Sequence, residues 1–152
     1  MPPIQLVSAR AMALDVQKAE ETEARIGESE PFDILVNSAG IARDLPAMET
    51  SAELFRQILD VNLVGSFIAS KAAVERMGDD LAIVNISSVS GLRANKGRVA
   101  YGASKAGVKM MTEVMAGELG TARVRVNCIA PGPVETPMVS RLHTAADPSQ
   151  WL

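Results

Sequence analysis

Three short apolar runs, separated by stretches with helical periodicity, constrain the fold of this chain more than any other feature of its sequence. They cover residues 32–37, 81–86 and 124–129, and each is rich in β-branched side chains. Their hydrophobicity is nearly continuous, which is typical of strands that are covered on both faces in a parallel sheet. Because the order is strand, helix, strand, helix, strand, we predict right-handed crossovers and a three-layer α/β fold.

The stretch between the first two runs has a readable helix start. Thr50 and Glu53 have the spacing of a capping box, in which each side chain satisfies a free backbone N–H of the other residue. Apolar residues then keep helical spacing, so we expect a helix over residues 51–77. Asn62 and Gly65 are weak helix formers, and they predict a bend near its middle.

A second helix and a fourth, weaker unit complete the pattern. The helix is expected from about Ala100 to Leu119, with Gly120 closing it in the left-handed conformation. The weaker unit is an apolar strand over residues 11–14 that leads into a charged helix ending near Gly27. No internal repeat or linker divides the sequence, so residues 1–152 are expected to form one domain.

The charge balance and the single cysteine exclude several classes of protein. The 152 residues carry 15 Lys and Arg against 18 Asp and Glu, so a broad basic surface for nucleic acid or anionic lipid is absent. Cys128 has no partner for an internal disulfide, which favours a reducing compartment. No apolar run approaches the roughly 20 residues that span a bilayer, and the start does not resemble a secretory signal. We therefore expect a soluble, cytoplasmic protein without nucleic-acid or membrane partners.

The segments that follow the three runs predict where a ligand binds. In parallel sheets, ligands bind beyond the carboxyl ends of the strands. Residues 37–40, 87–91 and 131–133 follow the three runs, and all are loop-like sequences rich in Asn, Ser, Gly or Pro. We expect them to converge on one edge of the sheet and to form the candidate site.

The strongest chemical signal is a tyrosine four residues before a lysine. Tyr101 is the only tyrosine, and Lys105 projects from the same face of the predicted helix. A phenol is a poor base at neutral pH, but a nearby ammonium favours the phenolate and makes it a usable acid/base group. The alternative is a surface pair on an amphipathic helix; Ser88, which ends the preceding strand, and the companion loops favour the site. His143 lacks the neighbours of a metal site, so no metal is expected.

Together these residues resemble the short-chain dehydrogenase/reductase family, over about residues 12–138. Residues 37–40 are similar to its N-N-A-G signature with serine in second place, and residues 131–136 are similar to its P-G-x-x-x-T loop. The catalytic residues that the resemblance implies are Asn62, Ser88, Tyr101 and Lys105. The cofactor contacts that it implies are Asp15, Val16, Asn37, Ala39, Gly40, Tyr101, Lys105, Pro131, Gly132, Val134 and Thr136.

The resemblance implies a Rossmann-like oxidoreductase that uses NAD or NADP and a small-molecule substrate. Tyr101 would be the acid/base group, and Lys105 would favour its phenolate form and bind the ribose hydroxyls of the cofactor. Ser88 would hold the substrate oxygen, and Asn62 would hold a water in a proton relay. The expected substrate is a sugar alcohol or another secondary alcohol, a class slightly preferred over the substrate of a 3-oxoacyl carrier-protein reductase on similarity over residues 37–43. The alternatives are a 3-oxoacyl carrier-protein reductase and a non-catalytic remnant that acts only in subunit association.

Two further expectations follow from the resemblance. A homodimer or homotetramer would bury apolar residues of the two long helices, including Phe67, Met111 and Met115. The family's first strand with its glycine-rich, pyrophosphate-binding turn, and its last strand, have no counterpart in these residues. We therefore expect an incomplete sheet in which residues 34–36 form a hydrophobic edge, and weak binding of a dinucleotide by these 152 residues.

Overall fold

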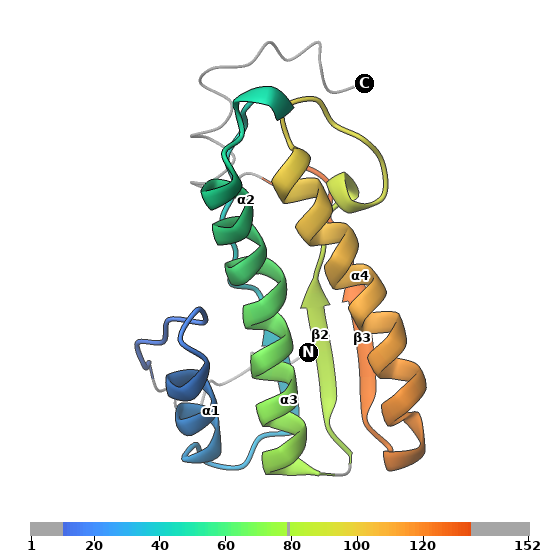
Figure 1. Ribbon diagram of the computed structural model, residues 1–152. Helices are drawn as coiled ribbons and strands as arrows, with labels where there is room; N and C mark the ends of the chain where they lie inside the picture. The colour runs from blue at the N-terminus through green and yellow to red at the C-terminus, as the bar shows by residue number, and fades with distance from the viewer. Residues whose placement is uncertain (1–10, 79, 135–152) are drawn as a thin grey trace, which may run out of the picture.

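The fold is a three-stranded parallel sheet with helices packed against it, seen in a computed structural model that describes residues 11–78 and 80–134 (Figure 1). The strands are β1 (Ile34–Asn37), β2 (Ala82–Ile86) and β3 (Arg125–Ile129), in the order β1-β2-β3. Both strand pairs are parallel, so the three carboxyl ends lie at the same edge of the sheet. The three strands predicted within residues 32–37, 81–86 and 124–129 and their parallel arrangement are confirmed.

Most of the remaining described residues are helical. In chain order the helical elements are α1 (Ala19–Gly27), η1 (Ala47–Glu49), α2 (Ala52–Leu59), η2 (Asp60–Val64), α3 (Gly65–Met77), η3 (Val89–Gly91), α4 (Val99–Leu119) and η4 (Gly120–Ala122). The elements η1, η3 and η4 are short 3-10 turns, whereas η2 is a π-helical segment between α2 and α3. In Figure 1, α3 and α4 lie in front of the sheet, and α1 packs beside α3.

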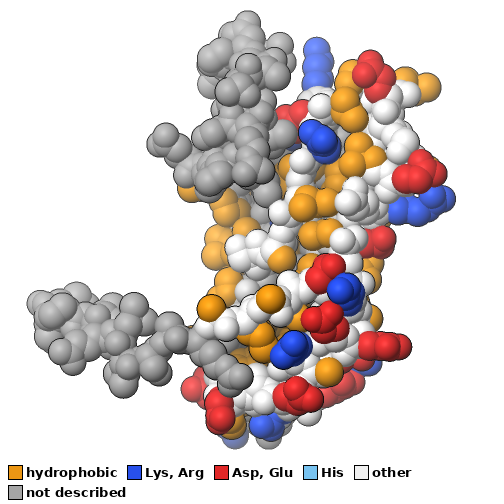
Figure 2. Space-filling model, turned by 90° about the vertical axis from the view of Figure 1, so that its left-hand side faces the viewer, with side chains coloured by type: hydrophobic (Ala, Val, Ile, Leu, Met, Phe, Trp, Pro, Cys, Tyr) orange, Lys and Arg blue, Asp and Glu red, His pale blue; other side chains and the backbone are white. Residues whose placement is uncertain are grey.

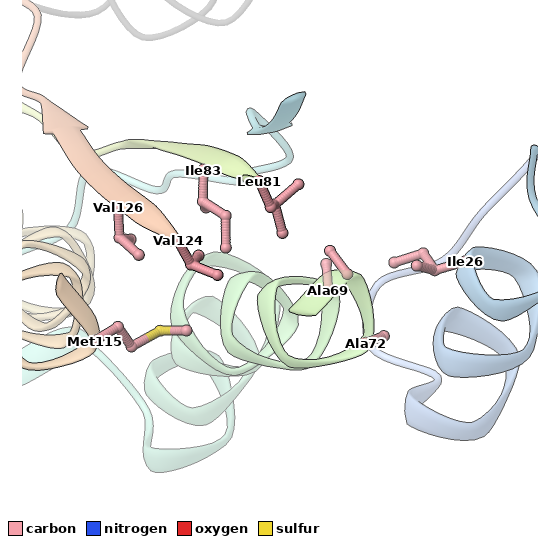
Figure 3. Close-up of a cluster of buried hydrophobic side chains, with 9 residues drawn as sticks. Ile26, Ala69, Ala72, Leu81, Ile83, Met115, Val124 and Val126 are labelled. Atoms are coloured by element: carbon pink, nitrogen blue, oxygen red, sulfur yellow. The ribbon is translucent and has the colours of Figure 1, made fainter. Parts of the chain in front are cut away.

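The hydrophobic core lies between the sheet and this layer of helices (Figure 3). Ile83 and Val126 point from neighbouring strands towards the helices, where they meet Ala69 of α3 and Met115 of α4. Small side chains on α3 allow the helix to approach the sheet closely. Met115 is 8% exposed, so its expected place in a subunit interface is wrong, and Met111 likewise packs against this core.

The other face of the sheet is open in the described part of the chain. The alternate positions of β1 leave Ile34 62% and Val36 55% exposed, and Ile129 of β3 is also exposed. Figure 2 shows hydrophobic side chains along its left margin, on the side away from α3 and α4. The described residues thus contain the sheet and one helix layer of the predicted incomplete three-layer fold, and β1 forms the expected hydrophobic edge.

The long predicted helix differs from expectation at its start and middle. Its N-cap is Ser51, whose Oγ accepts a hydrogen bond from the backbone N–H of Leu54 at 3.2 Å. Thr50 instead donates its hydroxyl to the carbonyl oxygen of Pro46 in the preceding turn, so the predicted Thr50–Glu53 capping box does not form. Asn62 and Gly65, where a bend was expected, lie in and directly after the π-helical segment η2, and the bend itself stays a prediction.

Two other expectations are wrong for local physical reasons. Gly120 is right-handed, because α4 continues into the 3-10 turn η4, and the left-handed residue is Arg123 with a φ of 59°. Residues 11–14 form no strand. A strand needs a neighbour to satisfy its backbone groups, and β1 pairs only with β2 in the described residues. The charged helix that ends at Gly27 is confirmed as α1.

Candidate active site

Lys105 lies at the centre of the candidate site, and α4 carries it to the carboxyl edge of the sheet. The side chain is 6% exposed, and its Nζ donates a hydrogen bond to the carbonyl oxygen of Ile86 at 2.7 Å. Ser87 Oγ donates to the backbone carbonyl of Lys105 at 2.7 Å, so β2 and α4 are joined at this point. Burial lowers the pKa of the Lys105 ammonium, and the charge of Cys128 opposes this shift in part.

Tyr101 lies one helical turn before Lys105, at the N-terminal end of α4. The Lys105 Nζ is 5.8 Å from the centroid of the Tyr101 ring. Ser104 Oγ donates to the carbonyl oxygen of Tyr101 at 2.7 Å and accepts from Nδ2 of Asn62 at 3.0 Å. Ser104 therefore links two of the expected catalytic residues. It lies inside the Tyr-x-x-x-Lys motif, and that position was the signal by which the sequence could have indicated it.

Asn62 is fully buried in the π-helical segment η2, where it fixes the loop that follows β1. Its Oδ1 accepts from the N–H of Ile41 at 2.8 Å, and its Nδ2 donates to the carbonyl of the same residue at 3.0 Å. This loop brings Gly40 close to Lys105. A Cβ on Gly40 would lie 3.3 Å from Asn62 Oδ1 and 3.7 Å from Lys105 Nζ.

Ser88 caps the turn η3 at the end of β2. It is 8% exposed, and its Oγ accepts a hydrogen bond from the N–H of Ser90 at 3.1 Å. The N–H of Val89 donates to the carbonyl of Pro131 at 3.0 Å, which joins this turn to the segment after β3. The segments that follow the three strands therefore meet around the end of β2, where Lys105 is anchored.

A chain of buried polar groups lies beneath the site. Asn37 Nδ2 donates to Ser70 Oγ of α3 and to Asn85 Oδ1 of β2, both at 2.8 Å, and Asn85 Nδ2 donates to Thr112 Oγ1 of α4 at 2.9 Å. Asn37 is one of the expected cofactor contacts, which stays a prediction, and its side-chain amide nitrogen donates to these groups in the interior of the fold. Sequence reasoning missed the role of Asn85, although an asparagine near the end of each of the three runs was the available signal.

The remaining expected cofactor contacts lie on the segment before α1 and on the loops after β1 and β3. Val16 packs against α3, where a Cβ on Gly65 would come within 2.8 Å of its Cγ2. Asp15 is exposed and accepts from the N–H of Gln17 at 3.1 Å. Three further positions on the loops are exposed: Ala39, Gly132 and Val134. Thr136 and His143 lie outside the described residues.

The described residues 11–78 and 80–134 hold no group of three or more His, Cys, Asp or Glu side chains that could bind a metal ion. Within the same residues, each helix is too short or too polar to cross a membrane.

The comparison with known proteins decides which family this site belongs to. A family model for the short chain dehydrogenases matches residues 4–147. The chain belongs to the short-chain dehydrogenase family. Its Tyr101-x-x-x-Lys105 motif and the loops around the end of β2 fall within the matched residues.

Curated members of this family resemble the chain over about half of their own length. Carbonyl reductase family member 4 of Danio rerio is 42% identical over 129 residues, which are 84% of this chain and 54% of the relative. The 3-oxoacyl-(acyl-carrier-protein) reductase FabG of Thermotoga maritima is 43% identical over 113 residues, which are 73% of this chain and 46% of the relative.

Solved structures of short-chain dehydrogenases share the fold. A putative short-chain alcohol dehydrogenase from Sinorhizobium meliloti 1021 superposes with a TM-score of 0.83 at 33% identity, covering 88% of this chain and 56% of its own. A 4-hydroxyisoleucine dehydrogenase mutant complexed with NADH and succinate superposes with a TM-score of 0.79 at 35% identity, covering 87% of this chain and 57% of its own. The parallel sheet is therefore Rossmann-like.

Proposed function

We propose that this chain carries the acid/base part of an NAD(P)-dependent oxidoreductase that interconverts a secondary alcohol and a carbonyl compound. The observation that carries the proposal is the buried Lys105, whose Nζ lies 5.8 Å from the Tyr101 ring at the edge where the strands end. A cation next to a phenol favours the phenolate, the form that accepts a proton. Tyr101 takes the hydroxyl proton of the alcohol in oxidation and returns it to the carbonyl oxygen in reduction.

Ser88 and Asn62 support this proton transfer from neighbouring elements. Ser88 Oγ lies on the turn after β2 and donates to the substrate oxygen, where negative charge develops. Asn62 holds the loop after β1 and, through Ser104, the carbonyl of Tyr101. Both Nδ2 hydrogens of Asn62 are used in these bonds, so the water of the predicted relay would bind to an acceptor oxygen of this residue.

The space beside Lys105 fits the ribose end of a nicotinamide dinucleotide. A side chain at Gly40 would occupy the space next to Lys105 Nζ, and the glycine leaves it open. Within the part of the chain that the structure describes, Ile86 takes one of the three Nζ hydrogens, which leaves two for ribose hydroxyls. When bound, the nicotinamide supplies the hydride acceptor for oxidation and the hydride donor for reduction. Ala39, Pro131, Gly132, Val134 and Thr136 are the further proposed contacts at this end, and Asp15 and Val16 are those at the adenine end.

Substitution at the acid/base position tests the proposal in a form of the protein that turns over substrate. Tyr101→Phe keeps the ring but removes its proton, so we expect kcat to fall by about 10²- to 10⁴-fold. Ser88→Ala removes the donor for the substrate oxygen, and we expect a loss of roughly 10²-fold. Ser29→Ala is the matched control, because the Ser29 hydroxyl donates to the nearby Ile26 carbonyl after α1 and is not among the expected site residues. Turnover by Tyr101→Phe within tenfold of the parent would refute the assignment.

The substrate has two proposed classes and one alternative without catalysis. A secondary alcohol such as a sugar alcohol is one class; a 3-oxoacyl thioester on a carrier protein is the other, and the names of several relatives favour it. Rates of NAD(P)H-dependent reduction of a 3-oxoacyl thioester, compared with rates of oxidation of sugar alcohols, distinguish them. No turnover with either class in a form that binds cofactor would favour a non-catalytic remnant that acts in subunit association.

A homodimer or homotetramer is also proposed, from apolar side chains that the long helices leave exposed. Phe67 on α3 is 46% exposed, and Val64, Met110 and Val114 are exposed on η2 and α4. These residues replace Met111 and Met115 as the proposed contact, because the latter two pack in or against the core. A second copy of the chain would remove this surface from water.

A further inference from the structure

A second cation lies beside the ring of Tyr101. Arg98 immediately precedes α4, and its Cζ is 5.9 Å from the centroid of the Tyr101 ring. The Lys105 Nζ is 5.8 Å from the same centroid. Two positive groups, one directly before α4 and one on it, therefore face the only tyrosine of the protein.

The position of Arg98 is fixed from the loop that follows β1. Its Nε and Nη2 donate to Oδ2 of Asp44 at 3.2 and 3.0 Å, and the two side chains are 16% and 31% exposed. The backbone of Leu45 pairs with Arg98 in a short parallel bridge, and the Leu45 N–H donates to the Gly97 carbonyl at 2.8 Å. Gly97 has a φ of 76°, a conformation that favours glycine, and this turn directs Arg98 back towards α4.

These contacts allow Arg98 to do more than join two loops. A guanidinium over an aromatic ring is attracted to it, and the attraction becomes stronger when the ring belongs to a phenolate. The charged groups around Tyr101 are Lys105 on its own helix, Arg98 before the helix and Asp44 on the loop after β1. Cys128 on β3 interacts electrostatically with Lys105. Asp44 offsets part of the Arg98 charge but also holds it in place.

We propose that Arg98 is a positioning residue for Tyr101, held by Asp44 so that its guanidinium stabilises the phenolate form of the tyrosine from outside the Tyr-x-x-x-Lys motif. This inference rests on the proposed acid/base role of Tyr101. It adds a contribution of the loop after β1 to that role, since Asp44 and Leu45 both belong to this loop. An arginine that only fastened two loops would change the stability of the fold but not the ionisation of the phenol.

Because the chain has one tyrosine, its ionisation is read directly from tyrosinate absorbance, and the single tryptophan does not titrate. We expect Arg98→Gln to raise the pH of half-ionisation by about half a unit or more relative to the parent. Arg98→Lys keeps a positive charge and should shift it less. Arg93→Gln removes an exposed cation from the segment between η3 and α4, to which Arg98 also belongs. This variant is the matched control, and we expect no shift in its pH of half-ionisation.

Circular dichroism of the same variants shows whether each of them folds. If Arg98→Gln does not fold, Arg98→Met takes its place, because methionine keeps the apolar stem of the side chain. In a form with turnover, the pH of half-maximal oxidation should move in the same direction as the absorbance titration. A shift in Arg98→Gln or Arg98→Met no larger than that in Arg93→Gln would overturn the inference. The titration needs no activity, so this result is distinct from retained turnover in Tyr101→Phe, which would refute the proposed function itself.

Discussion

Replacing Gly91 by alanine tests how tightly the turn after β2 is seated on the helix that carries Tyr101 and Lys105. Gly91 ends the turn η3, and a Cβ there would lie 2.6 Å from the carbonyl carbon of Lys105 and 2.7 Å from the nitrogen of Ala106. Ordinary contact begins at 3.4 Å, and both neighbours are backbone atoms that cannot rotate away. The turn must therefore move away from α4, and Ser88 at its start must move with it.

This overlap predicts a loss of both stability and activity. Forcing an extra carbon into a closely packed contact costs about 1–3 kcal/mol. With a urea m-value of about 1–3 kcal/mol per molar for a protein of this size, we expect the unfolding midpoint to fall by roughly 1 M. A displacement of about 1 Å between reacting groups costs about 10²-fold in rate, so kcat should fall by that factor in a form with turnover.

Two glycines of α4 provide matched controls for the same substitution. A Cβ on Gly117 meets nothing within 4 Å, so Gly117→Ala should stabilise the helix by about 0.5–1 kcal/mol. A Cβ on Gly107 would lie 2.8 Å from Cδ2 of Leu63, the end of a side chain that can rotate, so Gly107→Ala should fall between the two. Urea unfolding followed by circular dichroism ranks the three variants. A Gly91→Ala protein as stable as Gly117→Ala would refute the steric reasoning.

Three further predictions concern charge, association and cofactor. Burial lowers the pKa of Lys105 in the folded protein below its unfolded value of 10.5. At a pH between the folded-state pKa and the unfolded-state pKa, the unfolded chain binds more protons, so stability rises with pH. The unfolding free energy of Lys105→Met minus that of the parent should therefore be largest near neutral pH and shrink towards about pH 10; a constant difference would contradict this. In sedimentation, the parent should be a dimer or larger, and Phe67→Glu should dissociate it, whereas Met48→Glu, at a 97% exposed position of η1, should not; a monomeric parent would count against the proposed interface. In calorimetry, these 152 residues should bind NAD or NADP with a Kd weaker than about 10 μM, because the sequence contains no glycine-rich cluster for the pyrophosphate; tighter binding would show that such a turn is dispensable.

The strands and their parallel order could be predicted because apolar, β-branched runs have few other stable arrangements. The helix boundaries could not be placed to the residue, since several polar side chains compete for the same backbone groups. Thr50 and Ser51 can each cap a helix. The Thr50 hydroxyl donates to the carbonyl of Pro46 in the turn before α2, so Ser51 accepts the capping bond. Which of them caps α2 depends on that turn, which the spacing of two residues does not describe.

The candidate site was predictable where it depends on short motifs and was not where it depends on tertiary contacts. Tyr101 and Lys105 are four residues apart on one helix, so their proximity follows from helical geometry. Ser104 and Arg98 were missed, because their roles depend on Asn62 and Asp44, which lie 42 and 54 positions away in sequence. The strand expected over residues 11–14 was wrong for a related reason, since a strand forms only where another offers it backbone partners.

The buried asparagines link the fold to the candidate site, because they set the register of the strands on which the site depends. Asn37 pairs with Asn85 in the sheet, and both amides face the helices, where Ser70 and Thr112 complete their hydrogen bonds. A slip of one residue between β1 and β2 would turn one amide towards the open face and leave its partner buried without a bond, at a cost of about 1–3 kcal/mol. The correct register aligns the ends of the two strands. The loop that contains Gly40 and the turn that begins at Ser88 therefore leave the sheet at the same level, on either side of Lys105.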